Sequence, residues 1–99
     1  MTLKTFNEFK NYCNSLKNQA LYTISQNKEF FVEIEGNDLY FIPSSSQKRR
    51  KANSEKTERV LEKLIQTNSY MASDYKEITF HASYILAVAK SYQTKNIID

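Results

Sequence analysis

Four consecutive cations, Lys48 to Lys51, are the residues of this sequence best suited to chemistry. Three serines precede them, and further cations follow at helical steps of three and four residues. Cationic side chains beside hydroxyls and a helix N-terminus are the usual partners of phosphate oxygens. We therefore predict a nucleic-acid-binding surface, with a contribution from the last helix. Its members are Lys48, Arg49, Arg50, Lys51, Lys56, Arg59, Lys63 and Lys90.

The excess of positive charge is confined to this region. Residues 47–66 carry seven Lys and Arg against three acids, so the net charge of +3 comes from here. Such a surface suits contact with a nucleic-acid backbone. The alternatives are contact with an acidic protein surface and a solvated loop that has no partner. Glutamates on the same predicted helix also offer i,i+4 pairs that would neutralise part of it, such as Glu55 with Arg59.

Few other residues suit catalysis. The single imidazole, His81, and the single thiol, Cys13, fall in separate predicted helices. One His and one Cys are too few for a protein-only zinc site, and the single glycine, Gly36, cannot form a glycine-rich phosphate loop. We therefore predict a protein that is not an enzyme and that has no cofactor and no metal.

Three acids on a predicted hairpin offer one alternative to this prediction. Glu33, Glu35 and Asp38 share a face and could hold a hard cation, as the acids of metal-dependent nucleases do. However, Asn37 stands where a restriction-type nuclease requires a lysine. A solvated polar face is the interpretation we favour.

Length and composition indicate one folded domain over residues 1–99. The chain has a mass of 11.6 kDa, and 40% apolar with 13% aromatic residues is too much for a disordered chain. The longest apolar run, Tyr84 to Ala89, is too short to cross a membrane. Polar residues interrupt any signal-peptide core at the N-terminus. With a single cysteine, this predicts a cytoplasmic protein without a disulfide framework.

The first half of the chain predicts a helix and then a β-hairpin. Thr5 and Glu8 have the spacing of a capping box, and an apolar face follows at steps of three and four. Gly36-Asn37 separates two alternating runs, so Ile34 should lie opposite Leu39. A loop at Asn37-Asp38 is the alternative, which would pair Ile34 with Phe41 and keep the same faces. The predicted apolar helix face consists of Leu3, Phe6, Phe9, Cys13, Leu16 and Ala20.

The second half predicts an exposed loop and two helices. Residues 44–53 lack an apolar period, and Asn53 or Ser54 should then cap a helix with a buried stripe. A short turn at residues 73–77 leads to a last helix capped by Thr79. The two predicted stripes are Val60, Leu61, Leu64 and Ile65, then Phe80, Tyr84, Ile85, Val88, Ala89 and Tyr92.

These elements predict an α+β fold. It has an N-terminal helix, a two- or three-stranded antiparallel sheet built on the Gly36-Asn37 hairpin, and two C-terminal helices packed on the sheet. A helix-turn-helix is the alternative arrangement of the C-terminal helices. In that case the last helix would read the major groove with its exposed residues His81, Ser83, Lys90 and Gln93.

Residues from about 20 to 90 resemble a loosely defined group of small uncharacterised bacterial proteins, some of them accessories of restriction or mobile elements. The resemblance lies in Leu21 with Thr23, Lys28-Glu29-Phe30, the hairpin, Pro43-Ser44-Ser45, Arg49 or Arg50, and residues 79–87. His81 stands where that group has Asn. The resemblance implies an association with nucleic acid and transfers no catalytic residue.

Two functions follow as hypotheses. The first is a small non-catalytic nucleic-acid-binding protein of bacterial or phage type. The second is a regulator or inhibitor that binds another protein, of the anti-defence or toxin–antitoxin kind. Such a protein could form a homodimer through Phe31, Tyr40 and Ile42, which are expected on the second face of the sheet.

Overall fold

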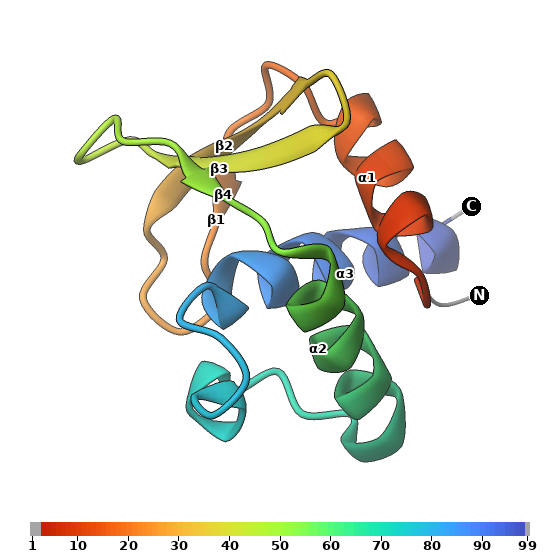
Figure 1. Ribbon diagram of the computed structural model, residues 1–99. Helices are drawn as coiled ribbons and strands as arrows, with labels where there is room; N and C mark the ends of the chain where they lie inside the picture. Colours follow the sequence, from red (N-terminus) through yellow and green to blue (C-terminus); the bar gives the residue numbers. More distant parts are fainter. Residues whose placement is uncertain (1–2, 99) are drawn as a thin grey trace.

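The structure is a computed structural model that describes residues 3–98, with side chains described as far as Thr94. Its helices and strands form an α+β arrangement (Figure 1). In chain order they are α1 (Phe6–Ser15), β1 (Leu21–Tyr22), β2 (Glu29–Glu35), β3 (Asp38–Pro43), β4 (Arg50–Lys51), α2 (Ser54–Thr67), the 3-10 helix η1 (Ala72–Tyr75) and α3 (Ala82–Ile98).

Helix α1 begins at the predicted capping box. The Thr5 hydroxyl accepts a hydrogen bond from Glu8 N at 3.1 Å, and the Glu8 carboxylate accepts one from Thr5 N at 3.1 Å. Hydrogen bonds from the Lys4 and Thr5 backbone lower the pKa of Glu8. The helix ends at Ser15 and Asn18 takes a left-handed φ of 65°, so Ala20, predicted to belong to the apolar helix face, lies outside the helix and is exposed.

The sheet is antiparallel and has four strands in the order β1-β2-β3-β4, one more than the largest number predicted. The hairpin register is the predicted one, because Ile34 pairs with Leu39 and Val32 with Phe41. The additional strand β4 arises in the stretch predicted to be a loop. Its two residues pair with Tyr40 and Phe41, and these cross-strand partners are distant in sequence.

The helices cover one face of the sheet. Figure 1 shows α3 running beneath the strands, with α1 and α2 beside it. The central turns of α3, from Ile85 to Ala89, are buried on every side, as an apolar helix in the middle of a core must be. The predicted α+β fold with two C-terminal helices is confirmed; α3 packs against the sheet, whereas α2 packs mainly against α3 and α1.

Two apolar residues were wrongly predicted to be buried. Ile65 of α2 is 47% exposed, and Phe80 is 96% exposed. Phe80 lies outside α3, which begins at Ala82. Thr79 does not cap this helix, because it lies three residues before Ala82; its hydroxyl accepts a hydrogen bond from His81 N, which also precedes the helix, at 3.1 Å. The cap of α2 is Asn53, whose side chain accepts from Lys56 N at 2.9 Å.

We predict that Gly36→Ala destabilises the hairpin. Gly36 has a φ of 62°, which L side chains rarely adopt, and a Cβ there would contact nothing within 4 Å. The cost therefore comes from the backbone alone and should be about 1 kcal/mol. Urea unfolding measures it, and Asn37→Ala is the control at the neighbouring turn position. Equal stability of the two variants would contradict this account of the turn.

Candidate nucleic-acid interface

Strand β4 divides the cationic run between two faces of the sheet. Lys51 lies opposite Tyr40 and Arg50 opposite Phe41, and successive side chains of a strand point to opposite faces. Lys51 therefore lies on the outer face, away from the helices, whereas Arg50 lies on the side of the helical layer. The four consecutive cations are not one continuous ridge.

Arg49 is held by the acids of the hairpin. Its Nη1 lies 2.8 Å from Glu33 Oε1 and 3.0 Å from Glu35 Oε2, and its guanidinium carbon lies 4.1 Å from the centroid of the Tyr40 ring. The hydrogen bonds to Glu33 and then Glu35 raise the pKa of Arg49. The charge of Arg49 is thus compensated by two carboxylates that share its Nη1 donor, so this arginine is less available to phosphate than an unpaired cation.

Lys51 has a weaker version of the same arrangement, with Nζ 3.4 Å from Asp38 Oδ1. The three hairpin acids are therefore partners of cations. Among the described residues, no group of three or more His, Cys, Asp and Glu side chains is placed to hold a metal ion. The metal-nuclease alternative finds no support in this arrangement.

Lys63 and Lys90 each lie over an aromatic ring. Lys63 Nζ donates a hydrogen bond to the Asp74 carbonyl and is 5.2 Å from the Tyr75 centroid. Lys90 Nζ is 4.9 Å from the Tyr70 centroid. Both side chains contribute to packing at the helical end, and Lys90 lies on a different element from the cationic run.

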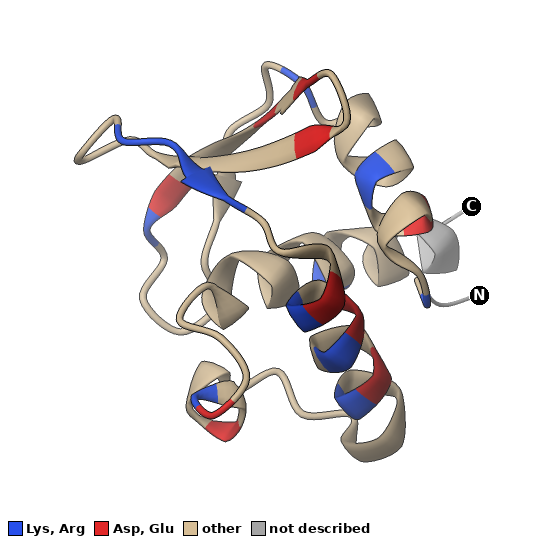
Figure 2. Cartoon of the chain, viewed as in Figure 1, with Lys and Arg blue, Asp and Glu red and all other residues tan. Residues whose placement is uncertain are grey.

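The remaining predicted cations are exposed and, within the described part of the chain, have no carboxylate within 4.0 Å. We call them the basic edge: Lys48, Arg50, Lys56 and Arg59. The expected pair of Glu55 with Arg59 does not form, and Glu58 instead accepts a hydrogen bond from Phe6 N at 2.7 Å. Figure 2 shows Lys and Arg following the chain through β4 and returning on α2, where acids alternate with them.

His81 belongs to this region, although sequence reasoning placed it on a base-reading helix. Its ring lies 6.5 Å from the Phe41 centroid and 6.3 Å from the Tyr84 centroid. Burial first, and then the charges of Arg50 and Lys56, lower its pKa below the usual 6.5. The charges of Arg50 of β4 and Lys56 of α2 therefore act on His81, which immediately precedes α3, and we call this place the junction. No local sequence signal could have indicated this junction.

The helix-turn-helix, which was the alternative arrangement of the C-terminal helices, is not formed. The element before α3 is the four-residue 3-10 helix η1, and α3 is enclosed along its central turns. Gln93, expected to be exposed, is half-buried and accepts a hydrogen bond from the Tyr70 hydroxyl. A helix enclosed in this way cannot enter a major groove.

The outer sheet face is the one expected as a dimer surface, and its use in a dimer stays a prediction. Phe31, Tyr40 and Ile42 are each half-buried, and Arg49 lies across Tyr40. The large apolar side chains that are most exposed among the described residues lie elsewhere, at Phe80 and Met71.

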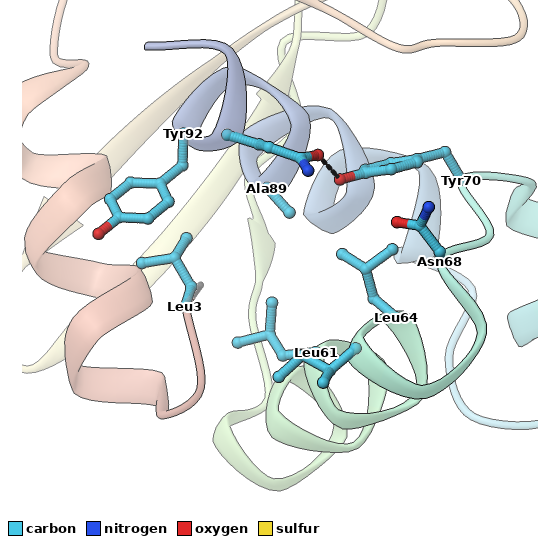
Figure 3. Close-up of a pocket in the computed structure, with 9 residues that line it drawn as sticks. Leu3, Leu61, Leu64, Asn68, Tyr70, Ala89 and Tyr92 are labelled. Carbon is cyan, nitrogen blue, oxygen red and sulfur yellow. Dashed lines mark hydrogen bonds between the residues drawn. The ribbon is translucent and has the colours of Figure 1, made fainter. Parts of the chain in front are cut away.

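Two of the hollows among the described residues share Tyr70 as a lining residue. The first, of about 150 Å³, lies between Leu3, Leu61, Ala89 and Tyr92, with the Tyr70–Gln93 hydrogen bond along one side (Figure 3). It is smaller than the roughly 300–1,000 Å³ of ligand pockets, and we regard it as a packing gap. The second is a groove of about 560 Å³ beside Phe80, which is discussed below.

No family model matches the sequence, and no curated protein and no solved structure is significantly similar to the chain. Among residues 3–98, no helix combines the length and the apolar character needed to traverse a lipid bilayer.

We expect Cys13 to be chemically inert in the folded protein. Its side chain is fully buried, and burial raises the pKa of the thiol to about 12. Because the thiolate is the reactive form, labelling by a disulfide reagent at neutral pH should require unfolding. Rapid labelling of the folded protein, measured beside a urea-unfolded control, would contradict the burial described here.

We expect His81 to make folding stability fall on acidification. Its pKa is lowered in the folded state, so below about pH 6.5 the unfolded chain takes up a proton first. Stability is therefore lost as pH falls from 6.5 through the lowered pKa. Urea midpoints between about pH 7.5 and pH 5.5 should decline less in His81→Gln than in the parent. Parallel declines would show that His81 is not the group responsible.

Proposed function

We propose that this protein is a small, non-catalytic nucleic-acid-binding protein whose basic edge contacts the phosphate backbone. The observation that carries the proposal is the set of exposed cations without a carboxylate partner among the described residues. Cations that are already paired within the protein gain little from a phosphate. Unpaired, exposed ones exchange counterions for phosphate at no internal cost.

The junction beside the start of α2 is the strongest part of this edge. Arg50 and Lys56 are close enough to His81 to depress its pKa, and the N-terminus of α2 adds the partial positive charge of a helix dipole. A phosphate placed here would relieve repulsion among these groups. This is the physical reason for putting the centre of the binding surface at Arg50 and Lys56, and not at the middle of the cationic run.

The proposed recognition is of the backbone and not of base sequence. α3, the helix expected to read bases, is enclosed along its central turns and cannot present side chains to base edges. With about four phosphates neutralised, log K should fall against log salt with a slope of roughly −3 to −4 on duplex DNA. We expect similar affinities for unrelated sequences.

The bacterial or phage origin, the cytoplasmic location and the resemblance to small bacterial proteins stay predictions. A regulator or inhibitor that binds another protein is the second candidate. The observation that favours it is the exposed apolar surface around Phe80.

The test compares two neighbouring arginines. Arg50→Ala should lower duplex affinity about fivefold to tenfold at 0.1 M salt and reduce the magnitude of the salt slope by about one. Arg49→Ala removes the same charge from the chain, but this arginine is bound by Glu33 and Glu35. The duplex affinity of the Arg49→Ala variant should therefore stay within about twofold of that of the parent.

Fluorescence anisotropy with labelled duplex and single-stranded oligonucleotides at two salt concentrations measures these effects. Equal losses in the two variants would contradict the distinction between paired and unpaired cations. A binding constant that does not respond to salt would remove the phosphate contacts altogether, and with them the proposed function.

A further inference from the structure

A groove at the helical end of the molecule is apolar and open to solvent. It lies between the turn after β1, the segment that contains η1, and the start of α3. Its volume is about 560 Å³, and its apolar walls include Ile24, Met71, Phe80 and Ala82. The groove shares no residue with the basic edge and has no role in the function proposed above.

The side chains around this groove are exposed to an unusual degree. Phe80 is 96% exposed, Met71 63% and Ile24 44%. Single exposed apolar residues are common on protein surfaces, but a contiguous group around a hollow marks a contact surface. Phe80 has no packing role that would account for an aromatic residue at this position.

We infer that a second copy of this chain occupies the groove, with the Phe80 ring of each copy inserted into the groove of the other. Phe80 both lines the groove and projects from it, so one face carries a projection beside a recess. A twofold dimer requires a surface of this kind, because each partner presents the same patch to the other.

Charge around the groove agrees with self-association. Of the described residues that line it, Lys76 is the charged one, and the exposed Glu77 is its neighbour in the chain. A twofold arrangement can set Lys76 of each copy against Glu77 of the other. The basic edge is made from other residues, so the cations that would repel a second copy are not part of this patch.

The area that would be buried in the dimer sets its expected affinity. An aromatic side chain buries about 150–250 Å², and the groove walls that receive it lose a comparable area. Two such insertions, with Met71 and Ile24 at their margins, remove about 1,000 Å² from water, which is near the lower limit of specific interfaces. The dimer should therefore be weak, with a dissociation constant of about 100 μM.

The natural absence of tryptophan gives a direct probe. The chain contains no Trp, so Phe80→Trp introduces a single tryptophan at the inserted position, which can be excited apart from the seven tyrosines. Between about 1 μM and 1 mM protein, its emission should shift to shorter wavelength as the ring leaves water. Ile65→Trp is the matched control, since Ile65 is 47% exposed but does not line the groove, and its emission should not change.

Sedimentation equilibrium tests both sides of the contact. The mass of the parent should rise from 11.6 kDa toward twice that value over the same range. Phe80→Ser removes the inserted ring and Met71→Arg obstructs the groove, and each should weaken association at least about tenfold. Ile65→Ser should associate like the parent.

All these positions are exposed, so circular dichroism and thermal melts should confirm that the variants stay folded. A parent mass that stays at 11.6 kDa at about 1 mM would overturn the inference. So would equal weakening by Phe80→Ser and Ile65→Ser. Because the groove and the basic edge share no residue, loss of oligonucleotide binding in Arg50→Ala leaves this result unaffected.

Discussion

The aromatic contacts of Phe41 hold the sheet and the helices together. Its fully buried ring lies 6.4 Å from the Phe9 ring of α1, 6.3 Å from the Phe30 ring of β2 and 5.4 Å from the Tyr84 ring of α3. One side chain thus touches the helical layer at two points and the neighbouring strand at a third. In a chain of 99 residues, which buries a modest share of its surface, such a shared contact makes the layers fold as one unit. It also sets the position of His81, and with it the junction of the basic edge.

Local patterns were sufficient where a short stretch determines its own geometry. Thr5 and Glu8 satisfy each other's backbone donors, so the start of α1 depends on four residues. The hairpin register follows from Gly36 and from the alternation on either side, because a shift by one residue would turn the apolar set to water. β4 was not predictable in this way. Arg50 and Lys51 have no apolar alternation, and they form a strand because β3 offers them a free edge.

The cations of the candidate site could be named from the sequence. The groups that each cation contacts could not. Arg49 and Arg50 are identical in type and adjacent, yet one faces Glu33 and Glu35 and the other approaches His81. The difference lies in which side of the sheet edge each side chain occupies, and that is a tertiary property. Phe80 was missed for a related reason. The expected helix started too early, and the actual start at Ala82 leaves Phe80 facing water.

The two outer strands, β1 and β4, each contain only two residues. An extended peptide that joins a sheet by main-chain hydrogen bonds needs a longer border than this. The sheet edges therefore offer little to an extended peptide, and the basic edge and the groove present side chains instead. Surface side chains can be exchanged while the interior is conserved, so a scaffold of this kind can acquire a new binding preference through a few substitutions and retain its architecture.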